Sequence, residues 1–313
     1  HRTIIFTVLF ILGLMAFKAT WGILVAIFIS LLIATAVYPL IERLEKLKIP
    51  KGVSAFIILL LIFVGLIASF ASIIPPMIDQ TSSFIRQLPA LMEQIPGWEL
   101  DPTIFTSQIN SLPGNILKVA VDTFSFFIFS TTIFVVSFYI MMERANIDKR
   151  LKLFFGENSQ KAKKIYIAIE KKLGHWVRSM IFLMLIIGVQ TYIGLTLMGI
   201  KYALPLAIIA GLLEIVTSVG PTISAIPAAI VGFATSPLHG FMVIGLYLVV
   251  QLLENNIIVP AVMKQTVGLH PLVTIISLLI GFELGGVLLA VLSLPLVLTG
   301  QIVLEHLYPQ ADI

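Results

Sequence analysis

Three carboxylates lie inside strongly apolar stretches of the last third of the sequence, at Glu214, Glu254 and Glu283. An acidic side chain at the depth of a lipid bilayer is costly unless it is paired, hydrated or protonated. Removal from water favours the protonated form of a carboxyl group, so such a residue can exchange a proton. We predict that these carboxylates bind a solute or a proton. The alternatives are positions near the membrane interface, helix–helix contacts or, for Glu283, a loop facing water.

Amide side chains accompany the second of these carboxylates. Gln251, Glu254 and Asn255 follow one another at i, i+3 and i+4, which places them on one face of a helix. Asn256 points elsewhere on the same helix and is a weaker candidate. This face predicts a polar site on a membrane-spanning helix.

A helix break follows the first carboxylate. Glu214 precedes the run Ser218-Val219-Gly220-Pro221, and proline cannot continue a regular helix. A break frees backbone polar groups that lipid cannot satisfy. We predict that Ser218, Gly220 and Pro221 line a cavity beside Glu214. A packed kink is the alternative.

Two further polar residues are weaker candidates for the same site. Arg178 opens an apolar run after a basic stretch and could bind an anionic group or a lipid phosphate, but it could equally be an anchor that snorkels to the interface. Gln190 lies in the middle of that run. It could join the polar site or form a hydrogen bond between helices.

The chain lacks the residues that several kinds of chemistry require. There are no cysteines, which excludes disulfides and thiolate chemistry. The five histidines are dispersed without metal-ligand spacing, and there is no His-Glu-x-x-His, Gly-x-Ser-x-Gly or phosphate-binding loop. We predict no metal, no cofactor and no enzymatic activity, and a nucleotide-driven pump is unsupported.

The composition predicts a membrane protein. Of the 313 residues, 58% are hydrophobic and only 12% are charged, and the mean hydropathy is +1.06. A soluble domain is usually about a quarter charged, so a soluble fold of this chain would lack the polar surface it needs. The net charge of +4 comes from clustered basic residues, which favours an anionic lipid leaflet over nucleic acid as the partner.

Hydropathy predicts an all-α, polytopic membrane bundle with about six full spans. Ile4–Phe17 is short and reads as a span, not a signal peptide; with Lys18 and Trp21 as interfacial anchors, it forms a helical hairpin with the next span. The other predicted spans are Trp21–Leu40, Val53–Ile74, Val119–Met142, Arg178–Met198 and Phe241–Ile258.

Two more apolar segments are interrupted. Residues 203–235 are broken at Ser218–Pro221 and again at Pro227, and residues 271–304 are broken at Gly281–Gly286. Each half of the first segment is about 14 residues, or about 21 Å of helix, too short for a full crossing, and the second segment also halves into two short pieces. We therefore predict two re-entrant helical hairpins, although simple hydropathy counting gives eight spans. Paired interrupted segments are typical of a transporter's binding site.

The resulting layout has five parts. Residues 1–75 form the N-terminal spanning helices, 76–118 an extracytoplasmic amphipathic insertion, 119–142 a spanning helix, 143–177 a cytoplasmic basic amphipathic region, and 178–313 the transport core. Both termini are predicted to be cytoplasmic, because 16 of the 20 Lys and Arg residues then lie on the cytoplasmic side. The four on the other side are Lys18, Arg86, Lys118 and Lys201.

Several short motifs follow one another in the last third of the sequence. They are Gly211-Leu212-Leu213-Glu214, Val219-Gly220-Pro221, Ile226-Pro227, Glu254-Asn255-Asn256, Val259-Pro260 and Gly268-Leu269-His270-Pro271. In these motifs, and in layout over nearly the whole chain, the sequence resembles the autoinducer-2 exporter family of bacterial membrane proteins. The resemblance is strongest from about residue 175 onward. The sequence departs from the family at Val216-Thr217-Ser218, where an Ile-Pro-Tyr-type run is common.

This resemblance implies a homo-oligomeric secondary transporter of the bacterial inner membrane, driven by an ion gradient. Its cargo would be a small polar solute or signalling molecule moved outward, with H⁺ or Na⁺ as the coupling ion. A cation/proton antiporter of the same family and a passive oligomeric channel remain open as alternatives. An intramembrane enzyme ranks last, because no nucleophile–base pair or metal site is recognisable.

Overall fold

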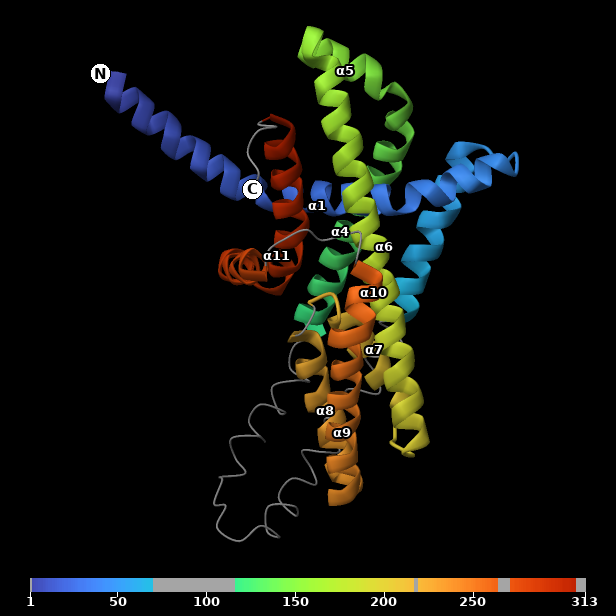
Figure 1. Cartoon of the computed structure of the whole chain (residues 1–313). Coiled ribbons are helices and arrows are strands. Elements are labelled where there is room, and N and C mark those ends of the chain that lie inside the picture. Colours follow the sequence, from blue (N-terminus) through green and yellow to red (C-terminus); the bar gives the residue numbers. More distant parts are fainter. Residues whose placement is uncertain (1, 70–115, 217–218, 264–270, 308–313) are drawn as a thin grey trace. The chain divides into compact units, whose positions relative to one another are not determined.

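In the residues that the computed structural model describes, 2–69, 116–216, 219–263 and 271–307, every regular element is a helix (Figure 1). The predicted all-α class is confirmed. The described helices are Lys51–Ser69 together with α1 (Arg2–Lys46), α4 (Ile116–Glu143), η2 (Arg144–Asn146), α5 (Ile147–Phe155), η3 (Gly156–Asn158), α6 (Ser159–Leu197), α7 (Ala203–Leu213), α8 (Val219–Thr235), α9 (Pro237–Leu253), η4 (Glu254–Ile258), α10 (Val259–Met263) and α11 (Pro271–Leu307).

Five described helical stretches are long and apolar enough to cross a membrane. A membrane-spanning helical bundle is thus the architecture that the length and composition of these helices support. The helices α7 and α8 are apolar but shorter. The five stretches are Lys18–Lys46, Lys51–Ser69, Phe127–Leu197, Pro237–Val262 and Leu272–Leu307.

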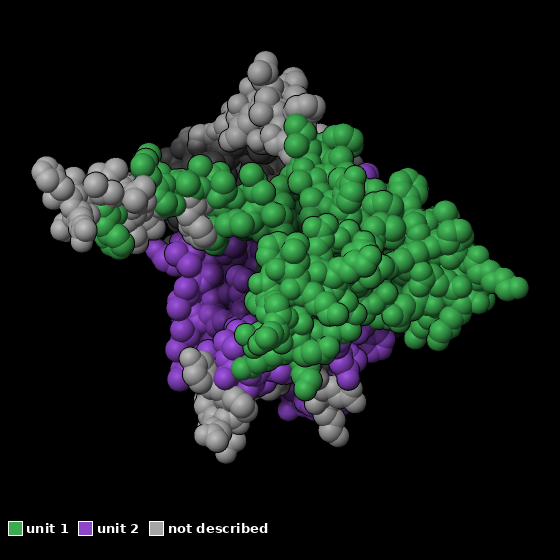
Figure 2. All heavy atoms as spheres, turned by 90° about the horizontal axis from the view of Figure 1, so that it is seen from above, with its two compact units in different colours: residues 1–61, 118–166 green, residues 62–117, 167–313 purple. Residues whose placement is uncertain are grey.

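The chain forms two compact units, coloured separately in Figure 2. The first comprises residues 1–61 and 118–166, and the second comprises residues 62–117 and 167–313. In the first unit, α1 and α4 are joined by serine hydroxyls. Ser30 Oγ lies 3.2 Å from the carbonyl oxygen of Ile133, and Ser137 Oγ donates a 3.3 Å hydrogen bond to the carbonyl of Ser30.

The N-terminal helix corrects one prediction. The expected hairpin between Ile4–Phe17 and Trp21–Leu40 is wrong, because α1 is a single helix of 45 residues. No glycine or proline lies between Phe17 and Trp21, and the Thr20 hydroxyl donates a 2.9 Å hydrogen bond to the carbonyl of Ala16 one turn earlier. Interfacial anchor residues therefore do not end a helix that has no breaker.

Helix α6 also joins two segments that were predicted separately. The basic amphipathic stretch and the Arg178 span form one helix from Ser159 to Leu197. Leu173 and Trp176 in the first of these stretches are buried. The predicted insertion at 76–118 lies almost wholly outside the described residues.

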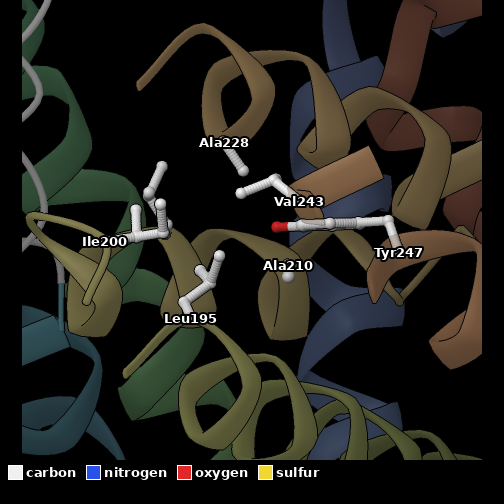
Figure 3. Close-up of a cluster of buried hydrophobic side chains, with 7 residues drawn as sticks. Leu195, Ile200, Ala210, Ala228, Val243 and Tyr247 are labelled. Atoms are coloured by element: carbon white, nitrogen blue, oxygen red, sulfur yellow. The ribbon is translucent and has the colours of Figure 1, made fainter. Parts of the chain in front are cut away.

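In the second unit, α7 packs against α8, and α8 packs against α9. Helix α6 approaches α7 closely, since a Cβ on Gly211 would lie 2.7 Å from the carbonyl oxygen of Met184. Small residues allow this backbone approach. The same unit contains a buried apolar cluster (Figure 3) that consists of Leu195, Ile200, Leu206, Ala210, Ala228, Val243 and Tyr247.

The first interrupted segment breaks once, not twice. The chain breaks just before the predicted position Ser218–Pro221, since α7 ends at Leu213 and α8 begins at Val219, with Gly220 and Pro221 in its first turn. The break at Pro227 is wrong, because α8 continues through it to Thr235. A proline inside a helix removes one hydrogen bond and can bend the helix without ending it.

The second interrupted segment breaks where the sequence predicts. Gly285 and Gly286 leave helical geometry inside α11, and Gly286 has a φ of 65°. A Cβ on Gly281 would lie 2.5 Å from the carbonyl oxygen of Leu289, so the chain folds back closely on itself there. The two halves of α11 accordingly run in different directions (Figure 1).

Candidate functional site

Two of the three predicted carboxylates meet inside the second unit. Glu214 follows the last residue of α7, and Glu254 begins η4. Both residues are 0% exposed. Their carboxyl groups lie close enough to interact with each other electrostatically. Residues that are far apart in the sequence thus form one buried acidic pair.

The turn after α7 places Glu214. Its backbone N–H donates to the carbonyl of Ala210 at 3.2 Å, and the N–H of Val216 donates to that of Leu213 at 3.0 Å. The N–H of Gly220, in the first turn of α8, donates to the carbonyl of Val216 at 2.8 Å. Gly220 and Pro221 are both buried. These bonds hold the two short helices together beside the acid.

A π-helical turn places Glu254. η4 covers Glu254–Ile258, where the wider turn replaces the regular helical ladder. Along the predicted face, Gln251 is half-buried, Glu254 is buried and Asn255 is exposed. Asn256 is also exposed, and its side-chain amide donates to the carbonyl of Leu252 at 2.8 Å. Only Glu254 of these four enters the buried pair.

A tyrosine and a serine that the sequence reasoning missed lie in the same region. Tyr247 is seven residues before Glu254, hence on the same face of α9, and its ring points into the apolar cluster (Figure 3). Its hydroxyl lies beside Ser224 of α8. Ser224 in turn donates a 3.0 Å hydrogen bond to the carbonyl of Pro221. The seven-residue spacing from Glu254 was the signal available in the sequence.

The carboxylate of Glu214 has no positive charge to balance it among the described residues. Both of its oxygens are buried and receive no hydrogen bond from a donor in the described part of the chain. Two unit charges about 4 Å apart repel by about 4 kcal/mol at an effective dielectric constant of about 20. Two ionised carboxylates also cannot form a hydrogen bond with each other, because neither carries a proton to donate. The arrangement can therefore hold one shared proton or one small cation.

The remaining predicted residues lie outside this pair. Glu283 is exposed, just before the Gly285–Gly286 turn of α11. Arg178 is half-buried, and its Nη2 atom lies 3.3 Å from His175 Nδ1. Gln190 has a buried side-chain oxygen that no donor among the described residues reaches. Ser218 lies outside the described residues. Across the described ranges, no cluster of three or more His, Asp or Glu side chains could hold a metal ion.

Comparisons with known proteins agree over almost the whole chain. A family model described as AI-2E family transporter matches residues 4–309. The chain is 29% identical to the candidate transport protein YueF of Bacillus subtilis, over 86% of this chain and 81% of YueF. It is 23% identical to the candidate transport protein YrrI of the same organism, over 93% and 90% of the two chains. With the candidate permease PerM of Escherichia coli the identity is 22%, over 93% and 89%.

Proposed function

Because the chain belongs to the AI-2E transporter family, we propose that it is a secondary transporter whose coupling site is the buried pair Glu214–Glu254. It exports a small polar solute or signalling molecule across the bacterial inner membrane, driven by an ion gradient, and works as a homo-oligomer. The observation that carries this proposal is the pair itself. Two facing carboxyl groups are expensive in an apolar bundle unless they bind and release an ion.

The exchange of a proton follows from the surroundings of the pair. While the pair is closed off from water, one proton shared between the carboxyl groups removes most of their repulsion. When the pair opens to water, both groups can be hydrated and the proton can leave. Binding of the solute near Gly220 and Pro221 would change which of these states is favoured. A ligand shifts such an equilibrium only by its difference in affinity for the two states.

The interrupted segments provide the parts that can move. We propose that residues 203–235 and 271–304 enter and leave the membrane on one side, in a bundle of about six full spans. The short helices α7 and α8, and the close turn of α11 at Gly281, support this arrangement. Irregular backbone at membrane depth is tolerated where it lines a cavity or is covered by protein.

The test is transport by the purified chain in proteoliposomes that contain a pH-sensitive dye. Small polar solutes are added one at a time under an imposed proton gradient. At least one of these solutes is expected to cause the release of protons. A protonophore should abolish accumulation of that solute. Absence of solute and proton movement under every imposed gradient, with the protein folded, would falsify secondary transport.

A cation/proton antiporter is the second candidate, and the same pair supports it. A small cation such as Na⁺ can replace the proton between two carboxylates, because both neutralise the same charge. Addition of Na⁺ alone, without any organic solute, would then release protons from the dye-loaded vesicles. Proton release that requires an organic solute assigns the chain to solute transport instead.

The proposed orientation leads to a labelling prediction. The chain has no cysteine, so the variants Lys46→Cys and Lys201→Cys each carry a single thiol at an exposed position. With both termini cytoplasmic, a membrane-impermeant maleimide added to intact spheroplasts is expected to label the Lys201→Cys variant. It should spare the Lys46→Cys variant until the membrane is permeabilised. The opposite labelling pattern would invert the topology, and equal labelling would show that the protein inserts in both directions.

A further inference from the structure

The short helix α5 ends in an apolar tip that no described element covers. Leu153, Phe154 and Phe155 are 77%, 75% and 54% exposed. They occupy the last three positions of the helix, before Gly156 turns the chain with a φ of 51°. Three consecutive residues spread over about 200° of the helix circumference, so they form a wedge at the helix end rather than a narrow stripe. Such a patch marks an interaction site.

Lysines surround this tip. Lys149 and Lys152 lie on α5, and Lys161 and Lys164 lie in the first two turns of α6; all four are exposed. Within the described residues none of the four has an ion-pair partner. Apolar residues that can insert, ringed by free cations, match the boundary between lipid headgroups and acyl chains.

Two ion pairs hold the hairpin that presents the tip. Arg150 Nε lies 2.9 Å from Glu143 Oε1, which joins α5 to the end of α4. Lys163 Nζ lies 2.7 Å from Asp148 Oδ2, which joins α5 to α6. These two carboxylates are thereby occupied, and the other lysines remain available for an external anion.

The tip is also close to a membrane boundary along the chain. The apolar run of α4 ends at Glu143, and the three residues of η2 lead directly into α5. α5 has nine residues and is therefore about 14 Å long. The tip therefore lies within about 20 Å of helix from the end of the apolar run of α4.

We propose that α5 docks on an anionic phospholipid surface, with Leu153, Phe154 and Phe155 below the headgroups and the four lysines on lipid phosphates. A second copy of this chain is the weaker occupant, because two tips with the same ring of lysines repel each other. An acidic groove on another protein would lack the apolar depth into which three adjacent large side chains insert. The proposal is independent of the proposed coupling site.

The test uses the absence of native cysteines. Phe154→Cys and, as a control in the η2 turn that precedes α5, Ala145→Cys at an exposed position are labelled with the environment-sensitive dye NBD. The full-length proteins are reconstituted in phosphatidylcholine alone and in a phosphatidylcholine–phosphatidylglycerol mixture. In the mixture, the dye at position 154 is expected to emit at shorter wavelength and to be quenched several-fold by lipids brominated on the acyl chain. The dye at position 145 should show little quenching.

A lysine-depleted variant separates charge from apolar insertion. This variant carries Gln in place of Lys149, Lys152, Lys161 and Lys164, in the Phe154→Cys background. It is expected to show the same dye emission and quenching in the two lipid mixtures, and high salt should have the same effect on the parent Phe154→Cys protein. A dye at position 154 that stays in water in both mixtures would overturn the proposal. Equal insertion in both mixtures would also overturn it, because the headgroup charge would then play no part. Disulfide cross-linking between two copies of the unlabelled Phe154→Cys variant would assign the tip to a protein interface instead.

Discussion

Glu254→Gln is expected to reduce proton-coupled transport about tenfold to a hundredfold while the protein stays folded. The amide of Gln can donate a hydrogen bond to Glu214 but cannot ionise, so the variant mimics the singly protonated pair and loses the carboxylate repulsion that drives release of the shared proton. A coupling free energy of about 1–3 kcal/mol corresponds to a loss of this size. Glu214→Gln is expected to act in the same way. The double variant should be little worse than either single one, because the two residues act as a unit.

The measurement is solute-dependent proton release from proteoliposomes, with helicity and thermal unfolding recorded for each variant. Glu305→Gln is the control, because Glu305 is an exposed carboxylate of the same unit that accepts a 2.8 Å hydrogen bond from Gln301. It should transport like the parent protein. Normal transport by a folded Glu254→Gln variant would remove that residue from the mechanism. Loss of folding in the Gln variants would show that the pair is structural instead.

Gly220→Ala is expected to be the most damaging single-methyl change in the transport core. A Cβ at this position would collide with the backbone of Leu213 and would lie 2.9 Å from the backbone nitrogen of Glu214. Backbone atoms cannot rotate away as the end of a flexible side chain can. The α7–α8 turn would have to open, at a cost of about 3 kcal/mol. Because Glu214 is in that turn, transport should fall together with stability.

Gly245→Ala is the matched control for this prediction. Gly245 lies within α9, and a Cβ there would meet no atom within 4 Å. Replacing a helical glycine by alanine at an open position is neutral or stabilising by about 0.5–1 kcal/mol. Thermal unfolding in detergent should therefore separate the two variants clearly. A Gly220→Ala protein as stable as Gly245→Ala would mean that the close turn is not required.

The sequence predicted those features that depend on local residue chemistry. Proline and glycine predicted the break between α7 and α8 and the turn in α11, since both residues change the backbone directly. Buried acids stood out because their surroundings are apolar. The continuity of α1 was missed because Lys18 and Trp21 resemble interfacial anchors, yet neither interrupts backbone hydrogen bonds.

Other features depend on tertiary packing and could not be read from spacing. That Glu214 and Glu254 meet, while Glu283 does not join them, depends on how α7, α8 and α9 pack. Pro227 reads as a breaker in the sequence, but α8 continues through it. The exposure of Asn255 follows from the π-helical turn, whose single extra residue leaves no local signature in the sequence.

That π-helical turn has a consequence for comparing relatives. A π turn accommodates one more residue than the α-helical turn it replaces, so removal of one residue between Leu253 and Val259 would restore a regular helix without shortening either neighbour by a turn. Homologues that differ by one residue at 254–258 would thus share the same flanking helices. A one-residue gap in an alignment there would indicate an α-helical turn in place of the π-helical turn. The side chains on either side of the gap would keep their directions, because the π turn takes up the extra residue. Alignments across this point should therefore match Glu254 by its buried position and not by its distance from Pro260.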